Sequence, residues 1–316
     1  MGAMTQGVVA VVVTYRRLPE LTRLLECLGR STVPLLGCVI SDHSPDGSVA
    51  EVARRIDTLE VVVREDASNP GPGAGWSNAA QTAIAHFGER VTALWYLDDD
   101  VVPEPDCLEI LCRDIGSANA IAPLLSDTEG NLWAFPEPEE PELRRLIRVA
   151  GQPADARRLI GDAPHAACWA TGACLLVTRR AYDRLGGHRT DFWLLGEDLE
   201  YSMRLAGEGG LVFTCRATVP HLPNPPGDAR AALRGGYVKF CSLLQNLSYL
   251  SFHSSHSRHM RRYLPGNFRR FFRTYGWGVT QIADAASCLL GGIVQGQPAG
   301  GSIGQNLRRK IASRHA

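Results

Sequence analysis

Residues 7–13 read Gly-Val-Val-Ala-Val-Val-Val, an apolar run without a polar break. A strand that faces water on one side alternates apolar and polar residues, so this run predicts a strand buried on both faces, as in a parallel sheet. Two further strands are expected over 36–40 and 59–63, and stretches with helical spacing separate the three at 18–30 and 49–56. These repeated units predict an α/β fold with a mostly parallel, Rossmann-like sheet flanked by helices. Ligands of such folds bind beyond the carboxyl ends of the strands.

Three consecutive carboxylates, Asp98, Asp99 and Asp100, follow an expected strand over 91–97. Like charges side by side repel one another, and a bound cation removes that cost. Oxygen ligands of this kind suit Mg²⁺ or Mn²⁺, and Mg²⁺ is commonly shared between one or two carboxylates and the phosphates of a substrate. The run therefore predicts a metal site that holds a diphosphate. A solvated acidic turn is the alternative.

Other expected strand ends in the first half also carry polar or glycine-rich residues. Thr14–Arg17 follow the first apolar run, and Asp42–Asp46 follow the second. Asn69–Trp76 contains three glycines and two prolines, which predicts a loop, and we expect a helix over 77–87 directly after it. Amides at that helix start could face an anion. Taken alone, the glycines are better explained by an ordinary connection before the helix.

The net charge is zero, but the charges are unevenly distributed along the chain. Of the 33 basic and 33 acidic residues, 13 basic residues and one acidic residue, Asp284, lie from Arg230 onward. We therefore divide the chain into an α/β domain over 5–229 and a basic helical region over 230–316. A basic-aromatic region of this kind is expected to meet an anionic partner such as a membrane surface. Packing on the acidic body and a homo-oligomer interface are the alternatives, and no nucleic-acid-binding motif accompanies the region.

The cysteines and the apolar runs bear on the compartment. Nine cysteines occur singly, without a Cys-x-x-Cys pair, which argues against a disulfide framework and for a reducing environment. No apolar run approaches the ~18 residues of a membrane span, and the first run is too short for a signal peptide. We therefore expect a cytoplasmic protein, peripheral on the inner face of the cell membrane.

The regular pattern is interrupted over 126–164, where Glu137–Glu142 alternates glutamate with proline and indicates a charged linker within an insertion. Further along, Glu197 and Asp198 open an expected helix. Acidic side chains in a first turn usually complement the helix dipole. A final strand then leads to His221, a residue that is more often structural than a ligand unless oxygen ligands converge on it.

Five motifs, in this order, resemble the inverting glycosyltransferases of family 2, which have the A-type glycosyltransferase fold. They are Val11–Arg17, Asn69–Trp76, Leu97–Asp100, Thr171–Leu176 and Gly196–Tyr201. The glycine-rich loop together with the triple aspartate is similar to the galactofuranosyl- and rhamnosyltransferase branch. The resemblance implies metal-dependent transfer of a sugar from a UDP- or dTDP-sugar to a hydroxyl of a glycan, a lipid-linked saccharide or a small molecule.

The resemblance also implies roles for the matching residues. Donor-binding roles fall on Thr14, Arg16, Asp42, Asn69, Gly73, Trp76, Asp98 and Asp99. The metal, Mn²⁺ or Mg²⁺, would be held by Asp98, Asp100 and His221. Asp198 would be the general base that removes the proton of the acceptor hydroxyl, a contribution of roughly 10²–10⁴-fold.

Two other functions compete with this interpretation. A sugar-nucleotide nucleotidyltransferase would carry a catalytic basic residue in a glycine-rich signature near the N-terminus, which Arg16 and Arg17 match only faintly. A non-catalytic module that binds a sugar nucleotide or a membrane would not need Asp198 and His221. Hydrolysis of a donor in the presence of Mn²⁺ separates a catalyst from a binding module.

Overall fold

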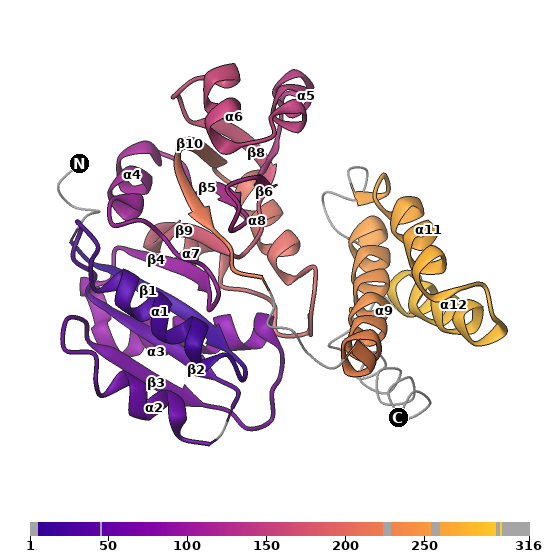
Figure 1. The fold of residues 1–316 in the computed structure, drawn as a ribbon, viewed down its shortest axis with the longest axis horizontal. Helices are drawn as coiled ribbons and strands as arrows, with labels where there is room; N and C mark the ends of the chain where they lie inside the picture. The colour runs from indigo at the N-terminus through magenta and orange to yellow at the C-terminus, as the bar shows by residue number, and fades with distance from the viewer. Residues whose placement is uncertain (1–5, 45, 224–228, 254–259, 295–297, 299–316) are drawn as a thin grey trace. The chain divides into compact units, whose positions relative to one another are not determined.

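The computed structural model describes residues 6–44, 46–223, 229–253, 260–294 and 298, and the first part of the chain is built on one mixed sheet (Figure 1). The strands are β1 Val8–Thr14, β2 Gly37–Asp42, β3 Val61–Glu65, β4 Ala93–Asp98, β5 Ala120–Ser126, β6 Leu132–Ala134, β7 Glu137–Pro138, β8 His165–Trp169, β9 Cys174–Thr178 and β10 Leu211–Pro220. Within the described residues they lie in the order β3-β2-β1-β4-β9-β5-β10-β8-β7, with β6 paired to β5.

The strand directions bring several strand ends to one edge. The strands β3, β2, β1 and β4 are mutually parallel, and β10 is parallel to β5. Because β9 is antiparallel to both β4 and β5, those two strands point the same way. The carboxyl ends of β1, β2, β4, β5 and β10 therefore share one edge. The expected α/β fold with a mostly parallel sheet is confirmed.

Helices cover both faces of this sheet (Figure 1). They are α1 Leu18–Leu28, α2 Ser48–Ala53, α3 Pro72–Phe87, α4 Cys107–Asp114, α5 Pro141–Val149, α6 Pro153–Ile160, α7 Arg179–Leu185 and α8 Glu197–Gly207, with a short 3₁₀ turn at Gly88–Arg90. In β1, Val8 and Val12 join the core under α1 and α4, whereas Val9 and Val11 join the core under α3 and α8. Both faces of β1 are buried, which explains its unbroken apolar sequence.

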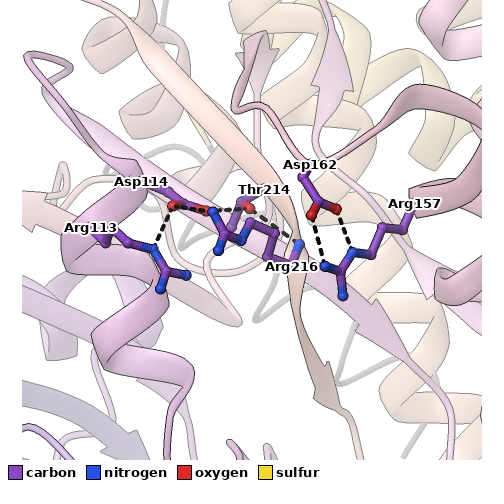
Figure 2. A network of polar contacts seen from close by, with 6 residues as sticks. All are labelled: Arg113, Asp114, Arg157, Asp162, Thr214 and Arg216. Atoms are coloured by element: carbon purple, nitrogen blue, oxygen red, sulfur yellow. Dashed lines mark hydrogen bonds and ion pairs between the residues drawn. The ribbon is translucent and has the colours of Figure 1, made fainter.

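A bulge in β10 is held by a small polar network (Figure 2). The register of β10 against β5 shifts between Thr214 and Thr218. The hydroxyl of Thr214 donates to Asp114 Oδ2 at 2.7 Å and accepts from the backbone N–H of Arg216 at 3.2 Å. Arg113 Nε donates to the other oxygen of Asp114 at 3.2 Å. The Thr214 hydroxyl therefore accepts from a backbone N–H within the bulge, where the pairing of the strands is interrupted.

The segment over 126–164 is more ordered than the expected charged linker. Glu137 lies in β7, which pairs with β8, and its carboxylate is buried and bonded to Arg144 Nε of α5 at 2.5 Å. Arg157 of α6 forms a two-point ion pair with Asp162, at 2.5 and 2.9 Å (Figure 2). The linker prediction for Glu137–Glu142 was wrong. Proline and charge content indicated a linker, but Glu137 and Pro138 pair with β8 and the Glu137 carboxylate is buried in an ion pair.

The helix α3 begins earlier than expected. We expected a loop to Trp76 and a helix from residue 77, but α3 starts at Pro72, so Gly73, Gly75 and Trp76 lie in its first turns. Proline is tolerated there because the first N–H groups of a helix have no partner within it. A Cβ on Gly75 would lie 2.8 Å from Val13 Cγ2, so the glycine permits α3 to pack closely on β1.

The chain forms two compact units. The first contains residues 1–69, 75–187 and 201–224, and the second contains 70–74, 188–200 and 225–316. The second unit includes α9 Ala229–His253, α11 Leu264–Tyr275 and α12 Val279–Ile293, which confirms the expected C-terminal helical extension. Its core contains Tyr237, Cys241, Leu244, Phe271 and Cys288. Among the described helices, none is both long and apolar enough to cross a membrane. A functional boundary between residues 229 and 230 stays a prediction.

Candidate active site

Strand register lines up the polar residues at the carboxyl edge of the sheet. Thr14 at the end of β1 pairs with Asp42 at the end of β2, and Val13 pairs with Asp98 at the end of β4. His221 directly follows β10 and forms an isolated antiparallel bridge with Val101. Residues that lie far apart in the sequence therefore meet at one edge, as parallel strand ends do.

Asp98, Asp100 and His221 form a group whose ligand atoms all lie within 4.8 Å of one another. Backbone hydrogen bonds hold the group together: the N–H of His221 donates to Ser126 O at 2.8 Å, and the N–H of Leu222 donates to Asp100 O at 2.8 Å. Asp100 is buried, whereas Asp98 and His221 are half-buried. Two carboxylates and one imidazole are a suitable ligand set for Mn²⁺.

Burial of the His221 imidazole favours its neutral protonation state. Burial lowers its pKa, against the opposing effect of the nearby Asp100 carboxylate, whose Oδ1 lies 3.4 Å from His221 Nε2. A neutral imidazole is the form that coordinates a metal. The geometry and the protonation state of this group therefore both fit a divalent cation.

An arginine that our sequence analysis did not select also contacts the acidic run. Arg17 Nη1 lies 2.7 Å from Asp100 Oδ2, and Arg17 Nε lies 3.6 Å from Asp99 Oδ1. Thr14 donates its hydroxyl hydrogen to Asp99 Oδ2 at 2.7 Å. Burial raises the pKa of Asp99 to about 7, although Thr14 and Arg17 oppose the rise. Arg17 offsets part of the repulsion among these carboxylates. Its position three residues after the end of β1 was the only signal in the sequence.

A second missed residue is Trp133, on β6. Its indole stacks on the ring of His221, with the ring centroids 4.0 Å apart and the ring planes 20° apart. The indole is also 49% exposed, so one face packs on the imidazole while much of the ring meets solvent. Nothing in the sequence connects residues this far apart. The contact arises because β6 pairs with β5, beside the strand that leads to His221.

Asp42 has an unused acceptor at the end of β2. Its carboxylate is fully buried, Oδ1 accepts from the N–H of Ser44 at 2.7 Å, and Oδ2 has no hydrogen-bond partner among the described residues. Burial raises the pKa of Asp42. A buried carboxylate oxygen without a partner is costly, so it is suited to accept a hydrogen bond from a ligand.

The other expected donor-binding residues lie around this edge in different settings. Arg16 and Asn69 both have left-handed backbones, with φ of 57° and 44°, and the N–H of Arg16 donates to Ser44 Oγ at 2.5 Å. Strained backbones of this kind persist only where the surroundings fix them. Thr14 is buried, and its hydroxyl is bonded to Asp99. Contacts of Thr14, Arg16 and Asn69 with a donor stay predictions.

The glycine-rich segment is packed against protein. A Cβ on Gly71 would lie 2.0 Å from Trp193 O, and one on Gly73 would lie 2.7 Å from Arg189 O. The two glycines therefore let the segment approach the backbone of residues 189–193. Trp76 is 3% exposed and meets Tyr96 edge-on, so its indole belongs to the core. Donor contacts by Gly73 and Trp76 stay predictions.

Asp198 lies in the first turn of α8, as expected, and is half-buried. Its Oδ1 accepts a hydrogen bond from the N–H of Leu199 at 2.8 Å. The turn before it has left-handed residues at Leu195 and Gly196, with φ of 63° and 112°. Asn246 of α9 donates to Leu195 O at 2.8 Å and to Leu194 O at 3.2 Å, and so holds this turn. A carboxylate at a helix start stays ionised more easily, but the role of Asp198 as general base stays a prediction.

Comparison with known proteins gives a consistent family assignment. The family model described as "Glycosyl transferase family 2" matches residues 9–167. The chain is 26% identical over 246 residues to N-acetylglucosaminyl-diphospho-decaprenol L-rhamnosyltransferase of Mycobacterium tuberculosis (strain ATCC 25618 / H37Rv), covering 69% of this chain and 76% of that one.

Solved structures show the same fold at low sequence identity. Residues 1–349 of S. aureus TarS in complex with UDP-GlcNAc superpose with a TM-score of 0.58 and 14% identity, covering 98% of this chain and 91% of that one. GalNAc-T7 with UDP, GalNAc and Mn²⁺ gives a TM-score of 0.54 and 17% identity, covering 85% of this chain and 57% of that one. The mannosyltransferase PcManGT of Pyrobaculum calidifontis, with GDP-Man and Mn²⁺, gives 0.51 and 16%, covering 98% and 87%.

Proposed function

The chain belongs to glycosyltransferase family 2, and from this premise we propose that it is an inverting, metal-dependent enzyme that uses a nucleotide-diphosphate sugar. Its fold is the A-type glycosyltransferase fold, and it is a glycosyltransferase. The observation that carries the finer proposal is the meeting of Asp98, Asp100 and His221, with ligand atoms within 4.8 Å of one another, at the edge where the parallel strands end.

In this proposal the strand-end residues hold the donor. Asp98, Asp100 and His221 would bind Mn²⁺ or Mg²⁺, and a divalent ion there supplies neutralisation of the charge on the departing diphosphate. Asp42 would accept a hydrogen bond from an N–H of the nucleotide base through its unused Oδ2. Arg17 stands beside the same carboxylates and would keep Asp99 and Asp100 oriented.

The proposed chemistry is a direct displacement at the anomeric carbon. A bond forms between the acceptor oxygen and that carbon while the bond from the carbon to the diphosphate oxygen breaks, which inverts the configuration. Asp198 takes the hydroxyl proton of the acceptor, and the nucleoside diphosphate leaves with the electron pair. General-base catalysis of this kind contributes roughly 10²–10⁴-fold.

For the substrates, the name of the relative supports rhamnose as the sugar and a lipid-linked acceptor. That relative is a rhamnosyltransferase acting on N-acetylglucosaminyl-diphospho-decaprenol, as its name states. We propose a dTDP- or UDP-activated rhamnose or galactofuranose as the donor. We propose a lipid-linked saccharide as the acceptor, with a glycan or a small molecule as the alternatives.

The test is metal-dependent donor binding. We expect a panel of dTDP- and UDP-sugars to raise the melting temperature of the wild-type chain only with Mn²⁺ present, and Asp100→Ala to lose this dependence. Asp57→Asn, which changes an exposed acid outside the group, is the matched control. Release of a nucleoside diphosphate on turnover would identify sugar transfer, whereas release of pyrophosphate would identify a nucleotidyltransferase. The metal site would be contradicted if Asp100→Ala binds the nucleotide as tightly as the wild-type chain does, both with and without Mn²⁺.

A further inference from the structure

The helix α12 buries its one charged residue and several small residues. Asp284 is buried, and its Oδ2 accepts a hydrogen bond from Tyr237 of α9 at 3.1 Å. Gly291 and Gly292 are also buried, and a Cβ on Gly292 would lie 2.5 Å from Gln245 O. On the α12 side, small residues and a charged residue therefore let the two helices approach closely.

The buried side of α9 has the same character. Its fully buried polar side chains recur at helical spacing: Ser242, Gln245, Asn246, Ser248 and Ser251. Several of these are satisfied locally, since Ser242 and Ser248 donate to backbone carbonyls one turn earlier, at 3.1 and 2.7 Å. Helix pairs in water usually bury apolar stripes and expose polar ones. Of these residues, Gln245 and Ser248 lie against Gly291 and Gly292 of α12, so polar side chains are part of the contact between α9 and α12.

The outward face of α12 is uncharged and mostly apolar, with Thr280 and Ser287 as its exposed polar residues. Val279 is 86% exposed and Leu290 is 54% exposed, and Ile282, Ala283 and Ala286 are exposed between them. The exposed hydroxyl of Ser287 donates to Ala283 O within the helix at 2.8 Å. The single charged residue of α12, Asp284, points inward. A helix with an uncharged apolar face outside and its carboxylate inside is inverted relative to a helix in water, and an apolar face of this kind marks an interaction surface.

The neighbouring helix α11 carries exposed cationic side chains. Arg269, Arg270 and Arg273 are exposed, and no acidic residue lies on α11. Trp277, in the turn between α11 and α12, is 69% exposed and stacks on Phe272 of α11 with ring centroids 4.0 Å apart. An exposed tryptophan at the end of an apolar helix face, next to arginines, matches helices that lie in the interface of an anionic bilayer.

We propose that the outward face of α12, with the arginines of α11, docks on the surface of an anionic lipid bilayer. The face would lie in the headgroup region with its apolar side chains toward the acyl chains and the arginines on the lipid phosphates. Charge complementarity favours lipid over a second copy of the chain, because a symmetric dimer through this surface would bring the arginines of two α11 helices together. The inference goes beyond the proposed function. The consequence that the enzyme would meet a lipid-linked acceptor at the membrane rests on that function.

The test uses the full chain in vesicle flotation without donor or acceptor, so its result does not depend on catalysis. The probes are vesicles of phosphatidylcholine with and without phosphatidylglycerol. We expect flotation with the anionic vesicles and weaker flotation at high salt. For the double variant Ile282→Glu/Leu290→Glu, we expect the lipid concentration at half-maximal binding to rise by roughly tenfold or more. Arg269→Gln/Arg273→Gln should reduce flotation with the anionic vesicles and leave flotation with phosphatidylcholine vesicles unchanged.

The matched control is Arg148→Gln/Val149→Glu, which makes the same kinds of change on an exposed arginine and an exposed valine of α5 in the first unit. It should float like the wild-type chain. Circular dichroism and the melting temperature establish that each variant is folded, which is expected because the substituted side chains are exposed. Three results would overturn the proposal: no flotation of the wild-type chain, equal flotation of Ile282→Glu/Leu290→Glu, or a dimer that this variant dissociates while vesicle binding is absent.

Discussion

At the scale of single residues, the contact between Trp133 and His221 places a surface side chain against a proposed metal ligand. The stacked indole restricts rotation of the imidazole about its side-chain bonds, while the backbone bond to Ser126 O fixes the position of the residue. Groups that orient a ligand contribute to metal affinity, typically 10–100-fold when they are removed. We therefore interpret Trp133 as a positioning residue for the proposed metal site.

The first prediction concerns this contact. Trp133→Ala should weaken Mn²⁺ binding by about tenfold, measured by calorimetric titration of Mn²⁺ without nucleotide. Trp133→Phe should restore most of the affinity, because a flat ring can still stack. Trp277→Ala, which removes an exposed tryptophan in the second unit, serves as the control. Wild-type Mn²⁺ affinity in Trp133→Ala would show that the indole does not orient the ligand.

The second prediction separates the proposed general base from donor binding. Asp198→Asn should lower kcat by roughly 10²–10⁴-fold and leave Mn²⁺-dependent nucleotide affinity nearly unchanged. The asparagine oxygen can still accept from the N–H of Leu199, so the start of α8 should be preserved. Glu208→Gln, an exposed acid just beyond α8, should keep full activity. Normal turnover by Asp198→Asn would remove Asp198 from the role.

The sequence was sufficient for only part of the site at this scale. Asp98 and Asp100 were recognisable because they follow an apolar strand, whereas the ligand role of His221 was implied only by the family resemblance. Arg17 and Trp133 were not recognisable, since their importance comes from contacts with residues distant in the sequence. Arg17 reaches Asp100 across neighbouring parallel strands, and Trp133 reaches His221 through pairing of β6 with β5.

At the scale of elements, α3 and β1 depend on one glycine. Gly75 faces Val13 of β1 and His43 after β2, with would-be Cβ contacts of 2.8 and 2.9 Å. Glycine content led the sequence analysis to a loop because glycine disfavours helices by about 1 kcal/mol. Close packing outweighs that propensity here. The early start of α3 could therefore be recognised only once its partner strand was known.

The third prediction follows from this contact. Gly75→Ala should reduce the free energy of unfolding by about 1–3 kcal/mol, as expected for overpacking in a dense core, measured by urea denaturation. Gly151→Ala is the matched control, because a Cβ on Gly151 meets no atom within 4 Å. We expect its stability to stay within about 1 kcal/mol of the wild-type value. Equal stability of the two variants would show that the close contact is relieved without cost.

At the scale of the whole molecule, the residues proposed for binding and for proton removal fall in different units. Asp42, Asp98, Asp100 and His221 belong to the first unit, whereas Asp198 belongs to the second. The sequence anticipated a basic helical region after residue 229 from its charge. It gave no indication that the helical unit also includes 70–74 and 188–200, because that membership depends on contacts such as those of Asn246.

The fourth prediction concerns the hydrogen bonds from Asn246 to the turn before α8. Asn246→Ala removes both side-chain hydrogen bonds to the turn before α8 and leaves the carbonyls of Leu194 and Leu195 without this donor. Displacement of a catalytic group by about 1 Å can cost about 10²-fold in rate. We therefore expect kcat to fall by about that factor while Mn²⁺-dependent nucleotide affinity stays at the wild-type value.

The control is Ser242→Ala, which loses a buried hydroxyl of α9 that donates to Val238 O, and it should retain activity. A loss of nucleotide affinity equal to the loss of kcat in Asn246→Ala would mean that α9 supports the fold as a whole, and the specific link from α9 to the start of α8 would have to be abandoned.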